Sequence, residues 1–328
     1  MDFLIQSGID FVVFIQGLGN WLEGPMRFFT FLGSAEFFFL AFPALYWSID
    51  SALGLRVAYM LMANSALIDL SKLALAGPRP YWVSDRVMAF AGETSFGVPS
   101  GHAGRAVALW GTLATHLRKG WAWVTALVLI FFIGFSRIYL GVHFLHDVLL
   151  GWTLGALLLW LLTTQWGRLS AWLRGQSFCG QAGLALAVSL AYPLIAALIV
   201  QAHAGYELDP AWIPNILRAG PELPEPLALG GVVSMGGLFF GFSLGLAWME
   251  KQGGFRASGT LTKRVLRYVL GVLGVGILWF GLGQVLPHGE DLASQILRYL
   301  RYALTGAWVT GGAPWLFFRF SLMAKPES

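Results

Sequence analysis

Cysteine and charge are both scarce in this chain of 328 residues. The single cysteine, Cys179, excludes an intramolecular disulfide and any metal site built from several cysteines. Charged residues make up 12% of the chain and hydrophobic residues 57%, which is far too apolar for a soluble domain. The formal net charge is only +4, and the basic residues fall mostly in short loops, so nucleic acid is excluded as a partner.

The N-terminal segment lacks the features of a removable signal peptide. Its sequence, MDFLIQSGIDFVVFIQGLGNWL, has no basic n-region and no small-residue cleavage site. Because Asp10 interrupts the apolar pattern, we expect an amphipathic helix in the membrane interface, with a true span as the alternative.

Apolar runs of roughly 20 residues dominate the rest of the chain, and each is long enough to cross the hydrocarbon core as a helix. They predict an all-α fold, a polytopic transmembrane helical bundle of about nine spans plus the N-terminal interfacial helix. The expected spans cover residues 28–48, 55–76, 101–117, 121–141, 144–164, 181–203, 229–249, 266–286 and 298–318.

The basic residues predict how this bundle is oriented. If the spans alternate, one face receives most of the cations, and the positive-inside rule makes that face cytoplasmic. These cations are Arg56, Arg118, Lys119, Arg168, Arg174, Lys251, Arg256, Lys263, Arg264, Arg267, Arg319 and Lys325. Three polar motifs fall at the opposite face, so we expect a multi-pass protein of the inner (cytoplasmic) membrane whose site faces the periplasm.

Composition also divides the chain along its length. The cations and histidines that interrupt apolar sequence lie in the N-terminal half, whereas the chain after about Leu173 is rich in Gly, Ala and Leu. We therefore expect a catalytic transmembrane bundle at residues 1–175 and an appended bundle of about four helices, of unknown role, at residues 176–328. The proline-rich residues 206–226 predict a stiff irregular loop, either a lid over the site or a plain connector.

The first polar motif is KLALAGPRP, residues 72–80, at the end of the second expected span. Lys72 and Arg79 lie about two helical turns apart, so both can point the same way even though Pro78 and Pro80 end the helix. Two converging cations suit a phosphate. The alternative is that both side chains snorkel at a helix end.

The second motif is PSGHAGR, residues 99–105, at the start of the third expected span. A helix N-terminus beside a serine hydroxyl favours an oxyanion, although Ser100 can equally be a plain N-cap. His102 is either a catalytic or an interfacial histidine. Arg105, one turn deeper, has no role that the sequence assigns.

The third motif is SRIYLGVHFLHD, residues 136–147, which places charged groups where lipid is expected. Asp147 follows His143 by one helical turn, the spacing at which a carboxylate can accept the imidazole N–H and orient the ring as a nucleophile. His146 is a neighbour that the spacing disfavours. The alternative is a structural polar pair between helices.

Together, the pattern Lys-x6-Arg-Pro, Pro-Ser-Gly-His and Ser-Arg-x5-His-x3-Asp resembles the three-part signature of the type 2 phosphatidic acid phosphatase family, related to bacterial acid phosphatases and vanadium haloperoxidases. The resemblance covers about residues 25–165, including TFLGSAEF at residues 30–37, which is similar to the family's first-span pattern. The helices beyond about residue 175 lie outside it.

The resemblance implies a phosphohydrolase that works through a phosphohistidine. His143 would attack phosphorus, Asp147 would orient it, and His102 would protonate the leaving oxygen and then activate water. The phosphate-binding residues would be Lys72, Arg79, Ser100, Gly101 and Arg137. Three cations and a helix N-terminus can neutralise phosphoryl oxygens, and no carboxylate cluster suits Mg²⁺, so we expect no metal and no cofactor.

We therefore predict an integral-membrane lipid phosphatase, with undecaprenyl diphosphate as the favoured substrate because the site is expected to face outward. Its partners would be the lipid phosphate and the surrounding membrane lipids; the sequence does not specify the oligomeric state. The alternatives are a lipid phosphotransferase that uses the same site, and a phosphatase fused to a lipid-binding or translocating module.

Overall fold

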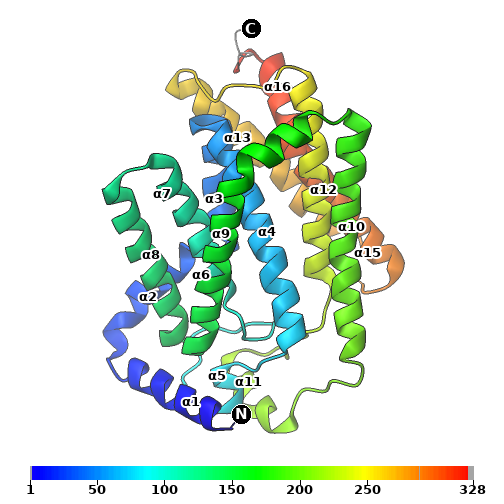
Figure 1. Cartoon of the computed structure of the whole chain (residues 1–328). Coiled ribbons are helices and arrows are strands. Elements are labelled where there is room, and N and C mark those ends of the chain that lie inside the picture. The colour runs from blue at the N-terminus through cyan, green and yellow to red at the C-terminus, as the bar shows by residue number, and fades with distance from the viewer. Residues whose placement is uncertain (1, 288, 324–328) are drawn as a thin grey trace. The chain divides into compact units, whose positions relative to one another are not determined.

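A computed structural model describes residues 2–287 and 289–323, and every regular element in these ranges is helical (Figure 1). The all-α prediction is confirmed. Lys325, one of the cations used to predict orientation, lies outside the described residues.

The helices follow one another along the chain with several breaks (Figure 1). In the first half they are α1 (Asp2–Gln16), η1 (Asn20–Leu22), α2 (Glu23–Phe31), α3 (Ala35–Ala44), η2 (Leu45–Ile49), α4 (Ser51–Leu75), α5 (Pro80–Val83), α6 (Gly101–Ala106), η3 (Val107–Gly111), α7 (Thr112–Leu117), α8 (Gly120–Tyr139) and α9 (Leu145–Arg174). In the second half they are α10 (Phe178–Ala202), η4 (Pro210–Trp212), α11 (Ile213–Ala219), α12 (Gly230–Lys251), α13 (Leu261–Gly276), η5 (Ile277–Gly281), α14 (Leu282–Val285), α15 (Leu292–Ala307), η6 (Trp308–Gly312) and α16 (Ala313–Arg319).

Six of the described helical stretches are long and apolar enough to cross a membrane, and the chain is a multi-pass membrane protein. They are Ser51–Val83, Gly120–Tyr139, Leu145–Arg174, Phe178–Ala202, Gly230–Lys251 and Leu261–Val285. A bent pair, Phe3–Gln16 with Asn20–Phe31, would make a seventh. The expected count of nine is not confirmed.

Several of the expected spans are interrupted or irregular. The expected span 28–48 is divided between α2 and α3, and the expected spans 101–117 and 298–318 each contain a five-residue π-helical segment. The N-terminal helix α1 is separate and turns by 84° from the stretch that follows it. Its location in the membrane interface stays a prediction.

The described residues form two compact units, each assembled from several stretches of sequence. Unit 1 contains residues 1–38, 63–163 and 198–227, and unit 2 contains residues 39–62, 164–197 and 228–328. Every site residue predicted from the sequence belongs to unit 1. The division into residues 1–175 and 176–328 by function stays a prediction.

Glycines allow α6 to lie very close to two other helices of unit 1. A Cβ at Gly151 of α9 would lie 2.5 Å from the backbone oxygen of Ser100, and one at Gly104 of α6 would lie 2.9 Å from Oδ1 of Asn64 in α4. Small residues permit this spacing between helices in a membrane. The second and third sequence motifs are thereby brought together.

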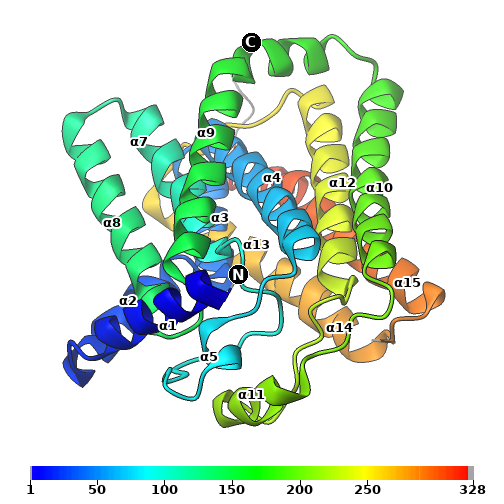
Figure 2. The same ribbon diagram turned by 60° about the horizontal axis from the view of Figure 1, so that its bottom comes forward.

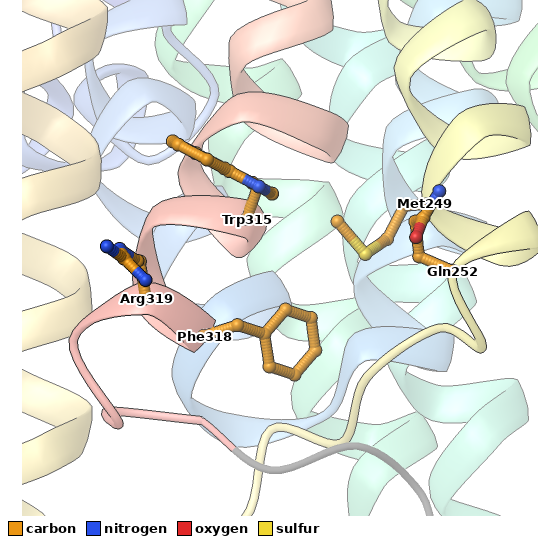
Figure 3. A pocket seen from close by; sticks show the side chains of 5 residues that line it. All are labelled: Met249, Gln252, Trp315, Phe318 and Arg319. Atoms are coloured by element: carbon orange, nitrogen blue, oxygen red, sulfur yellow. The ribbon is translucent and has the colours of Figure 1, made fainter.

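Unit 2 has its own core, in which glycines of α12 pack against the backbone of α15. A Cβ at Gly241 would lie 1.7 Å from the oxygen of Ala303. Trp47 is fully buried, and its indole N–H donates to Val309 O at 2.9 Å. This unit contains a cavity of about 370 Å³. Its lining side chains are Met249, Gln252, Trp315, Phe318 and Arg319 (Figure 3). It contains no residue of the predicted site.

Candidate active site

His143 lies in the short loop between α8 and α9 and is held by Asp147 in the first turn of α9. His143 Nδ1 is 3.2 Å from Asp147 Oδ2, and both side chains are buried. The same carboxylate oxygen accepts the backbone N–H of Phe144 at 2.9 Å. The imidazole therefore meets a carboxylate that the backbone already holds in place.

The partners of His143 also determine its tautomer. Asp147 can only accept at Nδ1, and the Arg79 guanidinium, 3.4 Å from Nε2, can only donate. The ring proton is therefore on Nδ1, and the lone pair of Nε2 points towards Arg79. This is the form required of a nucleophile.

Burial lowers the pKa of His143 to about 3, although the hydrogen bond to Asp147 opposes the shift. The positive charges of Arg79 and Arg137 act in the same direction as burial. The ring is therefore neutral near pH 7, and its Nε2 carries no proton.

Lys72 and Arg79 converge, as the sequence predicts, and they meet at Ser95. Lys72 Nζ donates to Ser95 Oγ at 2.8 Å, and Arg79 Nη2 reaches the same oxygen at 3.2 Å. Arg79 is fully buried, and its other N–H groups meet Ser95 O, Phe96 O, Val142 O and His143 Nε2. Arg79 thus also fixes the loop around the nucleophile.

Arg137, in the last turn of α8, has a donor to spare. Its Nη1 donates to Thr30 Oγ1 at 2.6 Å and its Nη2 pairs with Glu93, while the buried Nε has no hydrogen-bond partner. The backbone oxygen of Arg137 accepts the N–H of His143 at 3.2 Å. This cation is therefore positioned relative to the nucleophile by its own main chain.

The N-terminus of α6 brings the second motif beside Asp147. The N–H of Ser100 donates to Asp147 O at 2.9 Å, and Ser100 Oγ caps the helix by accepting the N–H of Ala103 at 3.5 Å. Gly101 begins the helix, and His102 is partly buried in its first turn. The N-cap reading of Ser100 is confirmed, whereas its binding of phosphate stays a prediction.

Arg105, whose role the sequence leaves open, lies against His102. Its Nη2 is 3.4 Å from His102 Nδ1, and its Nε donates to Gly33 O at 3.3 Å. A guanidinium only donates, so Nδ1 of His102 is the acceptor and Nε2 carries the proton. This tautomer is neutral, so delivery of a proton to a leaving oxygen requires the ring first to take up a second proton.

Sequence reasoning missed four residues of this site, which are Thr30, Gly33, Glu93 and Ser95. Thr30 and Gly33 belong to the TFLGSAEF stretch, which is similar to the family's first-span pattern. That similarity assigns no role to a single residue. Glu93 and Ser95 lie in the segment before PSGHAGR, where a carboxylate and a hydroxyl in apolar sequence were the available signal.

Helix α1 holds that segment in place. Gln16 of α1 is buried, and its amide joins Met88 to the end of α8 by donating to Met88 O and Tyr139 O at 2.8 and 2.9 Å. Its Oε1 accepts the N–H of Met88 at 3.0 Å. The N-terminal helix therefore supports the loop that carries Glu93 and Ser95.

The proline-rich stretch is also docked within unit 1. Helix α11 lies beside α5 (Figure 2), where Asn215 Nδ2 donates to Trp82 O at 3.0 Å. The rings of Tyr206 and Phe96 meet edge to face, with centroids 5.3 Å apart. This stretch is a packed part of the unit next to the site.

A neutral imidazole oriented by a carboxylate and surrounded by cations fits phosphoryl transfer, because that reaction depends on positioning and on neutralising charge at the phosphoryl oxygens. Within residues 2–287 and 289–323, no group of three or more His, Cys, Asp or Glu side chains is placed to hold a metal ion. The class defined by this site is that of the phosphoric ester hydrolases.

Known proteins agree with this class. The model of the PAP2 superfamily matches residues 53–171, and that of the PAP2 superfamily phosphatase transmembrane extension matches residues 233–325. Glucose-6-phosphatase 3 of Bos taurus is 29% identical over 368 aligned residues, which cover 99% of each chain.

Two further relatives match only a part of the chain. Phosphatidylglycerophosphatase B of Bacillus subtilis is 40% identical over 78 residues, 21% of this chain and 38% of its own. Undecaprenyl-diphosphatase of Sulfolobus acidocaldarius is 28% identical over 106 residues, 32% of this chain and 50% of its own. The chain belongs to the PAP2 superfamily and is a membrane phosphatase that carries the family's transmembrane extension.

Proposed function

We propose that the protein hydrolyses its substrate through a phosphohistidine at His143. Nε2 attacks phosphorus, the bond from phosphorus to the leaving oxygen breaks, and His102, which enters the step as an imidazolium, gives that oxygen a proton and becomes neutral. Water activated by His102 then attacks the phosphohistidine and releases inorganic phosphate. The observation that carries this proposal is the buried His143 ring, with Nδ1 3.2 Å from Asp147 and Nε2 facing Arg79.

The phosphoryl oxygens would be bound by the three cations and the start of α6. Lys72 keeps two N–H donors beyond the one used by Ser95, and Arg137 keeps its buried Nε. Positive side chains of this kind stabilise the charge of the transition state without moving during the reaction. Gly101 and Ser100 would add the partial positive charge of the helix N-terminus.

A sugar phosphate, with glucose 6-phosphate as the first candidate, is the substrate class that we infer from whole-chain likeness. The alignment with bovine glucose-6-phosphatase 3 spans 99% of both chains and therefore includes the extension. The likeness to the two bacterial and archaeal lipid phosphatases is confined to 21% and 32% of this chain.

A lipid phosphate is the second candidate, with undecaprenyl diphosphate as its preferred form. The charge bias of the loops supports a site facing the periplasm, where this lipid would be presented. The extension would then bind the lipid tail. A phosphotransferase would use the same phosphohistidine and pass the group to an acceptor other than water.

The test is phosphate release by the purified full-length protein from a panel of glucose 6-phosphate, undecaprenyl diphosphate, phosphatidic acid and phosphatidylglycerol phosphate. The first should turn over fastest; faster release from a lipid would reverse the ranking. A phosphorylated acceptor in place of free phosphate would indicate transfer. Phosphate release that persists in His143→Ala would refute the nucleophile.

Orientation can be tested with the native cysteine. Cys179 is exposed at the start of α10 and follows the basic residues Arg168 and Arg174. If this end is cytoplasmic, a membrane-impermeant maleimide should label Cys179 only after the cells are permeabilised. Labelling in intact cells would place the site on the cytoplasmic side.

A further inference from the structure

Glu93 places a carboxylate among the cations proposed to bind phosphate. It forms an ion pair with Arg137 Nη2, and its other oxygen is 3.7 Å from Arg79 Nη2. These arginine side chains are almost completely buried, whereas a quarter of the Glu93 side chain is exposed. The carboxylate therefore lies between buried cations and solvent.

The backbone of Glu93 is held independently of its partly exposed side chain. Its N–H donates to Tyr81 Oη at 3.1 Å, and its carbonyl oxygen accepts from the same hydroxyl at 3.3 Å. Among the described residues, the Glu93 carboxylate forms ion pairs with Arg79 and Arg137. A rotation of the side chain towards solvent would release Arg137 without moving the loop.

We propose that Glu93 is a specificity-determining residue, an internal counter-ion that a substrate must displace and that therefore selects a dianionic phosphoryl group over a monoanionic one. This inference rests on the proposed use of these cations for phosphate, and it adds the charge that the substrate must carry.

The selection follows from a comparison of charges. A monoanion that displaces Glu93 puts one negative charge in the place of another. Its electrostatic interaction with the cations is therefore little better than that of Glu93. A dianion brings a second charge and a further oxygen for the unpartnered Nε of Arg137. A terminal phosphoryl group of a monoester or diphosphate would thus be accepted, and a phosphodiester rejected.

Binding of two small ions tests this without turnover. Inorganic phosphate at pH 8 is mainly a dianion and dimethyl phosphate is a monoanion, and calorimetry with the full-length protein in detergent measures both. The wild type should prefer phosphate. Glu93→Gln should bind both ions about tenfold more tightly and bring binding of dimethyl phosphate into the measurable range, because neither ion then has a charged competitor to displace.

Matched variants separate charge from structural support. Glu93→Asp keeps the charge and should keep the wild-type affinities, whereas Glu207→Gln, an exposed residue of the same unit, should change nothing. If Glu93→Gln does not fold, Glu93→Ser provides the same comparison.

The proposal is overturned if Glu93→Gln weakens the binding of both ions, or leaves both affinities unchanged. Its failure is distinguishable from failure of the proposed function. Activity that persists in His143→Ala removes the nucleophile but leaves the ion affinities as measured, whereas unchanged ion affinities in Glu93→Gln leave the nucleophile untouched.

Discussion

His143 Nδ1 lies 3.2 Å from Asp147 Oδ2, and the N–H of Phe144 holds the same carboxylate oxygen at 2.9 Å. Asp147 is also held at its main chain, since its backbone oxygen accepts the N–H of Ser100. The pair therefore links the nucleophile to the start of α6, where the proposed acid is located.

Asp147→Asn should reduce kcat by about 10²–10⁴-fold with little change in KM, because an amide can present its N–H to His143 and favour the wrong tautomer. Steady-state kinetics on the best substrate of the panel measures the effect. His146, whose Nε2 is 3.1 Å from Asp147 Oδ1 and whose side chain is half exposed, is the matched control. His146→Gln should retain activity within about threefold. A wild-type kcat in Asp147→Asn would contradict the orienting role.

Gly97→Ala should lower turnover by about 100-fold, because displacing a catalytic group by about 1 Å has an effect of that size. A Cβ at Gly97 would lie 2.6 Å from Pro78 O and 3.3 Å from Asp147 Oδ2, so the segment that supplies acceptors to Arg79 must shift. Kinetics and thermal melting in detergent measure the outcome.

The control is Gly92→Ala in the same segment, where the added Cβ would meet only Ala219 O at 3.7 Å, an ordinary contact. Its activity should stay within about twofold of wild type. Equal activity of the two variants would show that the tight approach at Gly97 has no importance for the site.

The His143–Asp147 pair was predictable because it is local: both partners lie within one helical turn, and the spacing alone indicates a bond. The convergence of Lys72 and Arg79 was predictable in direction for the same reason. Their meeting point, Ser95, was not, because a contact across 23 and 16 residues leaves no periodic signal.

Glu93 and Thr30 illustrate the same limit. Each meets Arg137 from far along the chain, and a single polar residue does not reveal so distant a partner. The span count of nine is not confirmed, and a similar limit applies to it. Hydrophobicity identifies apolar stretches, but it does not show where a helix breaks, as between α2 and α3.

Asn215→Ala should destabilise the docked proline-rich stretch by about 1 kcal/mol, the usual net value of one hydrogen bond. The amide donates to Trp82 O at 3.0 Å and its oxygen accepts from Arg218 Nη2 at 2.8 Å. Limited proteolysis within residues 206–227 should become faster. Glu222→Ala, at an exposed position in that stretch, should leave the rate unchanged, and equal rates for both variants would argue against the docking contact.

Acid should destabilise the folded protein through two groups of the site. His143 has a pKa of about 3 in the folded protein because it is buried, against an ordinary value near 6.5. Although burial alone would raise it, the pKa of Glu93 is held well below its usual range by Arg137 and Arg79. In both cases the unfolded chain takes up its proton at a higher pH than the folded protein does.

Between pH 6.5 and about 3 the unfolded chain therefore binds more protons at His143, so stability falls as pH falls through this window. The stabilisation from Glu93 is present above pH 4.5 and is lost further down, as pH falls towards the folded pKa. Of these two groups only His143 contributes between pH 6.5 and 5, so its contribution is measured in this window by comparing the wild type with a His143 variant.

Melting temperatures in detergent should therefore decline from pH 6.5 to 5 in the wild type and decline less steeply in His143→Gln, which has no proton to gain there. His203→Gln, made in the turn after α10 and away from these contacts, should retain the wild-type slope. A slope in His143→Gln equal to that of the wild type would mean that the imidazole titrates alike in folded and unfolded chains. The neutral ring proposed to attack phosphorus would then not be maintained by burial.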